Sequence, residues 1–380
     1  MKTLFQLTLV ALLLTSTNLF AQVNAELPAT DPVAAPAAEE KEEEEPSFSL
    51  TGYVDAYFQN VFTDAEGSDA PGTPLAFPTS FAKETRGFGV GNVNLLAEKS
   101  MGKVGFVGQV GFGPRANAAN GDFPNLQQLY VTYAPSDAVT FTLGQFGTFV
   151  GYEVIDATAN MNYTTSYLFS YGPFFHTGLK ADFALAEGFG AMVGIFNNTD
   201  SRFNDPGYYY GAQLSAETGG LAAYLNFLTG TDAKDVNTDG DDATTFQVDL
   251  TATYEISEKF MLGVNASNKS TSLGDVDGDG FTGVALYLTA GLSESSSINL
   301  RAETFSVADE PRTDVEGRSV FALTASGNIN IGDLRLIPEV RFDSSSDFAT
   351  KYDGGIIGFG GDSDEDDSIA SFVLAAVYSF

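Results

Sequence analysis

The single histidine of the chain, His176, is the first residue to test for catalysis. It lies in the segment 173–184, "PFFHTGLKADFA", where it alternates with Lys180 and Asp182. A histidine beside a serine or a carboxylate can activate a nucleophile, and Ser170 and Asp182 are both near in sequence. Alternation also places His176, Lys180 and Asp182 on one face of an extended strand. We favour a residue that lines a wet interior over a hydrolase, because any strand wall offers such neighbours.

Two acidic stretches have the residue types of an oxygen-ligated calcium site. They are "DVNTDGDD" (235–242), with Asp235, Asn237, Asp239 and Asp241, and "DVDGDG" (275–280), with Asp275, Asp277 and Asp279. Ca²⁺ prefers oxygen ligands at alternate positions, with a glycine for the turn. The glutamate expected at position 12 is replaced by Phe246 in the first stretch and by Leu286 in the second. We therefore expect solvated acidic loop tips, with weak calcium sites as the alternative and no other cofactor.

Two further acids, Glu153 and Asp156, lie near the start of a long aromatic-rich connection, "GTFVGYEVIDATANMNYTTSYLFSYG" (147–172), next to Tyr152. Long connections without secondary structure of their own are usually functional or disordered. What these acids can do depends on the elements that the connection joins.

Those elements are strands. The carboxy terminus, "SFVLAAVYSF" (371–380), has apolar residues at every second position, which is the pattern of a strand with one apolar face. Similar segments of about ten residues recur from Phe48 onward, the length that a tilted strand needs to cross a bilayer. There are sixteen of them: 48–61, 86–98, 103–113, 124–134, 138–146, 173–184, 188–198, 207–217, 220–230, 244–255, 259–270, 281–292, 296–306, 318–328, 332–343 and 368–380.

The connections between these segments alternate between short and long. Short turns such as "KSMG", "APSD", "TGG" and "SEK" are separated by long connections at 62–85, 114–123, 147–172, 199–206, 231–243, 271–280, 307–317 and 344–367. This is the order of an outer-membrane barrel, with short periplasmic turns and longer external loops. We therefore predict an all-β fold: a transmembrane, antiparallel, up-and-down barrel of about 16 strands over 48–380. Pairing of the last strand with the first would leave no open edge.

The residues before the barrel have other compositions. Residues 1–25 have the positive start and short apolar core of a secretory signal, with cleavage after Ala21 or Ala25. Residues 26–47 are rich in Pro, Ala and Glu and predict a disordered acidic linker, which acts as a spacer or contacts a periplasmic partner. The chain has no cysteine, so it has neither disulfides nor thiolate metal sites. A net charge of −32 argues against a nucleic-acid partner.

The barrel hypothesis predicts which way the charged side chains of the strands point. In 332–343, Arg335, Glu339, Arg341 and Asp343 alternate with apolar residues. An arginine facing lipid at mid-membrane would cost about 2–4 kcal/mol, so these side chains must face a wet interior. The same argument predicts the pore-lining set: His176, Lys180, Asp182, Arg301, Glu303, Arg335, Glu339, Arg341 and Asp343. Pro338, within this segment, predicts a bulge or a point where the neighbouring strand has ended.

The connection 147–172 then has the place of the third external loop, which narrows the pore in general porins. We expect it to fold into the lumen, where Glu153 and Asp156 would face Arg301, Arg335 and Arg341 across a constriction. The alternative is an external, self-packed loop with solvated acids.

Five stretches resemble one family. "GYVDAYF" (52–58), "NLQQLYVTY" (125–133), "LGQFGTFVGYE" (143–153), "PFFHTGLK" (173–180) and "IPEVRFD" (337–343) are similar to the OmpL-like putative β-barrel porins of Gram-negative outer membranes. The resemblance covers the whole predicted barrel. It implies passive passage of solutes and no catalytic residues.

The function that we expect is therefore a porin of the cell outer membrane that passes small hydrophilic solutes or ions, with a modest preference for cations. Acidic mouths raise the local cation concentration within a Debye length, roughly 8–10 Å. The alternatives are a plugged surface barrel that binds an external partner, and a barrel hydrolase. Expected partners are the membrane lipid and the barrel-assembly machinery, for which Tyr378 and Phe380 resemble the carboxy-terminal signal. A homotrimer is an analogy with general porins.

Overall fold

The structure is a computed structural model, and it describes residues 47–62, 79–83, 86–121, 123–203, 207–232, 243–273, 276–309, 317–345 and 368–380. The signal segment 1–25 and almost all of the linker 26–47 lie outside these residues. Among the residues described, no helix is both long and apolar enough to span a bilayer.

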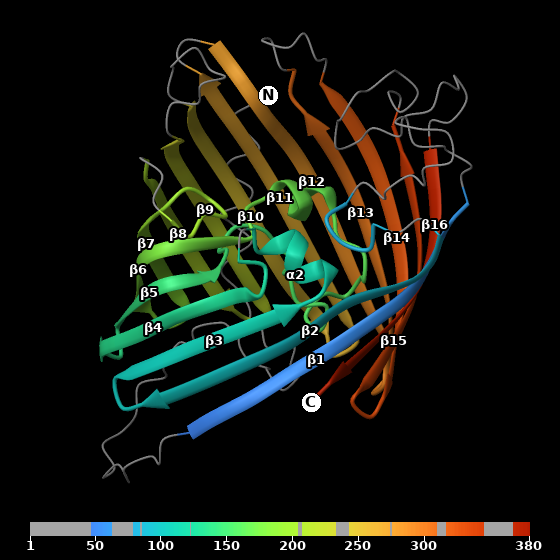
Figure 1. Ribbon diagram of the computed structural model, residues 1–380, viewed down its shortest axis with the longest axis horizontal. Helices are drawn as coiled ribbons and strands as arrows, with labels where there is room; N and C mark the ends of the chain where they lie inside the picture. The colour runs from blue at the N-terminus through green and yellow to red at the C-terminus, as the bar shows by residue number, and fades with distance from the viewer. Residues whose placement is uncertain are drawn as a thin grey trace.

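Sixteen antiparallel strands form one closed barrel (Figure 1). Each strand pairs with its neighbours in sequence, and β1 closes the barrel against β16 from Tyr53↔Ser379 to Val61↔Ser371. The strands are β1 (Ser47–Val61), β2 (Arg86–Met101), β3 (Val104–Phe112), β4 (Leu126–Ser136), β5 (Val139–Gly147), β6 (Phe175–Ala186), β7 (Phe189–Phe196), β8 (Tyr209–Thr218), β9 (Leu221–Asp232), β10 (Ala243–Ser257), β11 (Phe260–Leu273), β12 (Val276–Ser293), β13 (Ser296–Val307), β14 (Arg318–Ile331), β15 (Leu334–Ser344) and β16 (Ser368–Ser379). The predicted fold class and strand number are confirmed.

Alternation along each strand separates an apolar outer face from a polar inner face. On β4, for example, Leu129, Val131 and Tyr133 are 56%, 54% and 50% exposed. On β13, Arg301 and Glu303 point to the inner face and are each 0% exposed. An outward apolar belt is what a barrel wall presents to lipid. The inner charges are buried, so something other than water fills much of the barrel at their level.

The two ends of the barrel differ as predicted, with one exception. Seven connections, from β2–β3 to β14–β15, have only two residues each, and glycines with positive φ, such as Gly102 and Gly188, serve these tight turns. At the other end the connections are long, except between β11 and β12. The predicted long loop 271–280 is wrong, because β11 continues to Leu273 and β12 begins at Val276.

Pro338 interrupts the ladder without a bulge. On one side it pairs with Leu374 of β16. On the other side, the β14–β15 pairs run to Ser326↔Glu339 and resume at Ile329↔Leu336, in the same register. The missing N–H therefore removes pairing locally, while the strand order and register are unchanged. The predicted bulge is not present, and the neighbouring strand has not ended there.

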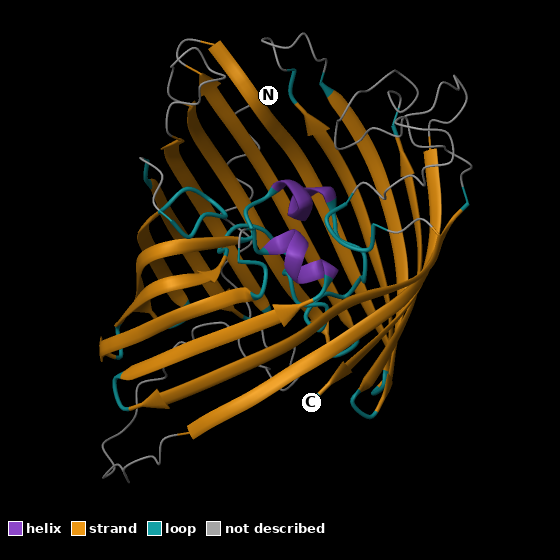
Figure 2. Ribbon diagram, in the orientation of Figure 1, coloured by secondary structure: helices purple, strands orange, loops and turns teal. Residues whose placement is uncertain are grey.

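Two short helices lie within the outline of the barrel (Figure 2). Helix α2 (Pro114–Ala119) belongs to the second long connection, and α3 (Tyr167–Tyr171) to the third. Buried residues of these connections, including Ile155, Tyr163 and Tyr167, supply core that the strands alone would not have. The interior is thus packed by inward-folded connections.

Candidate functional site

The third connection, residues 148–174, crosses the interior and is bonded to strands on opposite sides. Near its start, the N–H of Gly151 donates to Asp249 on β10 at 3.0 Å. Further along, the Asn162 amide donates to Ser326 on β14 at 2.8 Å, and the Tyr163 hydroxyl donates to Asp55 on β1 at 2.7 Å. Three contacts on three separated strands place this connection, called the inner loop below, inside the barrel.

Helix α3 begins where the inner loop meets β13. The Ser166 hydroxyl caps it by accepting from the Phe169 N–H at 3.0 Å. The next free amides, those of Tyr167 and Leu168, donate to the two oxygens of Glu303 at 2.9 and 2.7 Å. The first amides of a helix have no partner within it, and negative charge is favourable there. A wall carboxylate therefore completes the helix and fixes its position.

Glu339 on β15 binds the preceding turn of the inner loop in the same way. Its carboxylate accepts from the N–H groups of Tyr163 and Thr164 at 2.7 and 3.0 Å, and also from the Thr164 hydroxyl. Glu339 is 1% exposed. A buried carboxylate is tolerated when hydrogen bonds satisfy it, so Glu339 depends on the inner loop as much as the inner loop depends on it.

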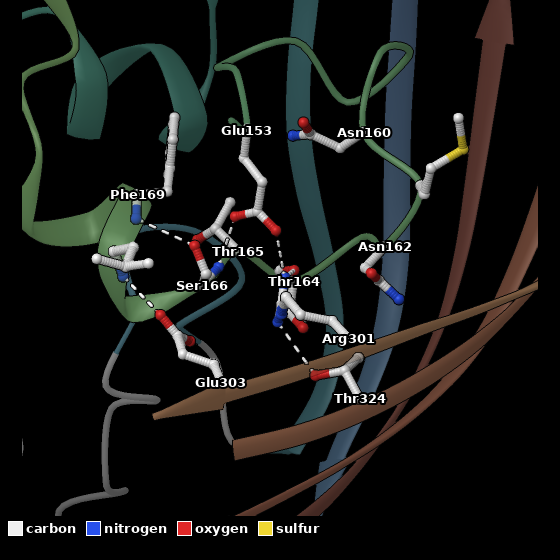
Figure 3. Close-up of polar contacts among 12 residues, drawn as sticks. Glu153, Asn160, Asn162, Thr164, Thr165, Ser166, Phe169, Arg301, Glu303 and Thr324 are labelled. Atoms are coloured by element: carbon white, nitrogen blue, oxygen red, sulfur yellow. Dashed lines mark hydrogen bonds and ion pairs between the residues drawn. The ribbon is translucent and has the colours of Figure 1, made fainter. Parts of the chain in front are cut away.

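Arg301 and Glu153 form a buried pair between wall and inner loop (Figure 3). The guanidinium lies 2.5 Å from one oxygen of Glu153 and also donates to the Thr164 carbonyl at 2.7 Å. The other oxygen of Glu153 accepts from the Ser166 N–H at 2.6 Å. Glu153 therefore joins the two halves of the inner loop as well as the wall. The predicted contact between Glu153 and Arg301 is present.

Asp156 does not face an arginine, contrary to expectation. One oxygen accepts from the Gln127 amide at 2.9 Å and, at longer distances, from Tyr53 and Asn94. The other accepts from the Gln109 amide at 3.0 Å. These donors, the amide cage below, are neutral, and Asp156 keeps partial exposure. Uncharged groups therefore orient this carboxylate, and the pattern of charged residues in the sequence could not indicate them.

A bulge in β4 makes the amide cage possible. Gln109 pairs with Gln128, but Val110 pairs with Leu126, so β4 has one extra residue. Gln127 and Gln128 can then both reach interior groups, Asp156 and Gln109 respectively. Two adjacent glutamines within an alternating strand were the available sequence signal.

Arg341, Asp343 and Arg335 also face the interior. Arg341 pairs with Asp343 at 2.9 Å on the same strand and donates to the Thr165 carbonyl at 2.7 Å. Arg335, half-buried near one end of β15, donates to the Ala157 carbonyl. Tyr152 stacks on Tyr287 of β12, with ring centroids 4.2 Å apart. All of them therefore bind or border the inner loop.

His176, Lys180 and Asp182 share the inner face of β6 without forming a catalytic set. Nε2 of His176 is 3.0 Å from the Thr148 hydroxyl, and its ring lies 5.0 Å from those of both Phe149 and Phe196. Lys180 pairs with Asp182 at 2.8 Å.

Ser170, the nucleophile candidate, donates to the Ser166 carbonyl and accepts from the Ser80 N–H. The predicted neighbours of His176 are thus engaged elsewhere.

Most of the proposed calcium ligands cannot be placed in the structure. Asp235, Asn237, Asp239, Asp241 and Asp275 lie outside the described residues. The backbone at Asp277 and Asp279 is in β12 rather than in a loop, which corrects the expected loop geometry. No cluster of potential metal ligands occurs among the residues that the structure describes.

The assembly residues lie at the closing seam. Phe380 and Gly52 exchange two backbone hydrogen bonds of 2.9 Å, and Tyr378 and Phe380 are 44% and 55% exposed. The role in assembly stays a prediction.

Two further groups were not predicted from the sequence. Arg115 of α2 lies 3.5 Å from Asp55 and donates to the Ile155 carbonyl at 3.2 Å, linking second and third connections to β1. In the fourth long connection, Asp200 accepts from the N–H groups of Phe174 and Phe175 at 2.7 and 2.9 Å. Burial raises the pKa of Asp200 to about 6, despite those hydrogen bonds.

Comparisons agree with this architecture. The family model described as "Putative beta-barrel porin-2, OmpL-like" matches residues 47–380. Among solved structures, the anion-selective porin from Comamonas acidovorans is 16% identical with a TM-score of 0.59, covering 88% of this chain and 100% of its own. The outer membrane channel DcaP of Acinetobacter baumannii is 15% identical with a TM-score of 0.59, covering 90% of this chain and 100% of its own. OprB of Pseudomonas putida is 13% identical with a TM-score of 0.57, covering 88% of this chain and 94% of its own.

At these identities the solved structures show the fold alone, and a search of the curated proteins found no match. The family match covers the whole described barrel, and the fold is that of outer-membrane channels. The chain therefore belongs to the OmpL-like β-barrel porin family and is a protein of the cell outer membrane.

Proposed function

We propose that this porin passes ions and small hydrophilic solutes along a path that the inner loop constricts. The observation that carries the proposal is the attachment of the inner loop to strands on opposite sides of the lumen, through Asp249, Glu303, Glu339 and Asp55. A segment fixed across a polar lumen narrows it permanently, and the groups it leaves accessible meet the passing solute.

We further propose a modest preference for cations, with Asp156 as the acid that contributes most. Three of the lumen arginines, Arg115, Arg301 and Arg341, are at most 3% exposed, and each has a carboxylate partner. A fourth, Arg335, is half-buried near one end of β15 and donates to the Ala157 carbonyl. Asp156 is partly exposed and its neighbours are neutral amides and a phenol. A charge that is exposed and unpaired acts on a passing ion more strongly than a charge neutralised by a neighbour.

The anion-selective porin among the structural neighbours makes the sign of selectivity worth measuring, although a likeness at 16% identity concerns the fold alone. The test is single-channel recording of the purified protein in a planar bilayer, with the reversal potential across a KCl gradient. We expect stable current steps and a reversal potential of the sign for cations. Absence of current would overturn the porin proposal, and a potential of the opposite sign would overturn the selectivity.

A plugged barrel is the second candidate function, and one observation favours it. Arg301, Glu303, Asp343 and His176 face the interior and are each 0% exposed, so packing rather than water surrounds them. A barrel that gives no current but still binds an external partner would fit this packing. For a hydrolase, His176 would need a nucleophile, and its hydroxyl neighbour is Thr148 beside two phenylalanine rings. We propose no enzymatic role, and a homotrimer remains a proposal by analogy.

A further inference from the structure

A cavity of about 200 Å³ lies where three long connections meet the wall of β1 and β2. One side of the cavity is formed by residues 80–83 of the first connection, and another by α2 of the second connection. Tyr163 of the inner loop forms a third side. The described part of the first connection contacts the inner loop. The Ser80 N–H donates to Ser170 at 3.0 Å, and the Phe81 ring lies 5.6 Å from that of Phe169.

The charges of the cavity oppose those of the whole protein. The chain has 50 acidic and 18 basic residues, yet among the described residues the charged ones that line the cavity are Lys83 and Arg115, with no acid. The carboxylate of Asp55 lies behind Gly91, where any Cβ would collide with it, and is 3.5 Å from Arg115. Asp55 already accepts from the Asn92 N–H and from the Tyr163 hydroxyl. Lys83 is exposed at the rim and has no ion-pair partner among the described residues.

The rest of the lining is mainly apolar and aromatic. The rings of Tyr57 and Tyr163 are 5.3 Å apart, and the Arg115 guanidinium lies 4.5 Å from the centroid of the Phe81 ring. The Nε–H of Arg115 is buried without a hydrogen-bond partner in the part of the chain that is described. Ala82 has a φ of 54°, and non-glycine residues held in this region are frequent at ligand sites.

We propose that this cavity binds a small carboxylate with a flat apolar body, of the size of benzoate. An apolar cavity of about 150 Å³ holds a benzene molecule, so this one has room for a ring and a carboxylate. Lys83 supplies the positive charge, because Arg115 behind it already has Asp55 as a partner, and the aromatic rings supply a flat apolar contact. The site does not require that the barrel conducts ions, so its test is equilibrium binding, whose failure would leave the porin proposal standing.

The experiment titrates the folded, full-length protein in detergent with sodium benzoate by isothermal calorimetry. We expect saturable binding at one site that weakens with added NaCl. Benzamide and benzylammonium keep the ring and remove or reverse the charge, and they should bind at least about tenfold more weakly. Failure of benzoate to saturate, or equal binding of benzoate and benzamide, would overturn the proposal.

Two pairs of variants place the site without removing Arg115. Lys83→Gln should weaken benzoate binding about threefold to fivefold, the effect of losing one exposed charge, while Lys259→Gln in a remote turn should not. Ala118→Phe adds a ring to the lining from an exposed position and should abolish binding. Its neighbour Asn117 is also exposed and does not line the cavity, so Asn117→Phe is the control. Binding that survives Ala118→Phe would show that benzoate binds elsewhere.

Discussion

The inner loop touches two walls of the barrel in different ways. Toward β13–β15 it meets five charged side chains, Arg301, Glu303, Glu339, Arg341 and Asp343, all at most 3% exposed. Toward β2–β4 it meets the amide cage, in which Asp156 keeps some exposure. Charge is therefore abundant where the loop is bound to the wall and sparse on the wall that we propose to meet the solute. The number of charges on a wall does not indicate which wall acts on solutes.

The wall of β13–β15 binds the inner loop through charged side chains because buried charges need hydrogen-bond or ion-pair partners. Glu303 and Glu339 together accept from four backbone amides of the inner loop. Leaving such groups unpaired costs about 1–3 kcal/mol each. The amide cage, in contrast, holds a carboxylate with neutral donors, which orient it without cancelling its charge.

The largest effect should come from removing the fastening. In the double variant Glu303→Gln with Glu339→Gln, each amide keeps one acceptor and directs its NH₂ group toward a backbone N–H. Two of the four contacts are lost, each leaving a buried N–H unpaired at a cost of about 1–3 kcal/mol, and the two that remain lose the charge of their acceptor, so the inner loop should detach. We expect larger current steps and cleavage of the loop by chymotrypsin, for which its tyrosines and phenylalanines are sites.

The matched control is Glu98→Gln with Asp182→Asn, which changes two carboxylates that hold no backbone amide of the inner loop. It should leave step size and cleavage unchanged. Equal behaviour of the two double variants would contradict the difference between the two walls.

The second effect separates the two acids of the inner loop. Glu153→Gln breaks a buried pair with Arg301, which typically costs about 3–5 kcal/mol, so the midpoint of thermal unfolding should fall. Asp156→Asn removes a charge whose neighbours are neutral amides, so it should change the midpoint of thermal unfolding little. It should move the reversal potential toward zero. Heat-modifiability on gels and bilayer recordings measure the two outcomes. The reverse assignment, selectivity lost in Glu153→Gln alone, would refute our choice of Asp156.

The smallest effect concerns Asp200, a half-buried acid in the fourth long connection. Its folded-state pKa of about 6 exceeds the ordinary value of about 3.9. Its contribution to stability is therefore fully present below about pH 4 and is lost as pH rises through 6. The total is at most about 3 kcal/mol. Asp200→Asn, which keeps an acceptor for Phe174 and Phe175, should raise the unfolding midpoint at pH 7.5 and not at pH 4. An equal change at both pH values would refute the argument.

The inner and outer faces of the barrel wall were predictable from sequence, because alternation of apolar and polar residues is a property of each strand by itself. Alternation needs only a strand and its two environments, and it placed Arg301, Glu339 and Arg341 on the inner face. It predicted a wet interior for them, whereas the structure buries them against the inner loop. It failed at "DVDGDG" (275–280), where Asp and Gly indicated a loop and the structure has mostly strand. Pairing with β11 outweighed the low β propensity of those residues.

The partners of the inner loop were not predictable in the same way. That Asp156 meets Gln109 and Gln127, instead of an arginine, depends on the β3–β4 register and on one bulge. Neither property is encoded within a single strand. The side chains of Arg115 and Asp55 meet across 60 residues of sequence, through connections without periodicity. Sequence patterns therefore predict the faces of the wall better than the contacts of the loops.

The position of the inner loop against β14 can be tested by cross-linking, because the chain has no cysteine and an introduced pair is therefore unique. Asn162→Cys with Ser326→Cys replaces two side chains that are 2.8 Å apart. We predict that mild oxidation, or a short bis-thiosulfonate reagent, links them within one barrel, and that the linked protein conducts like the wild type. Asn162→Cys with Ser215→Cys on β8 is the control and should not link. No link between 162 and 326, or a link that changes the current, would contradict a loop held in the lumen as described.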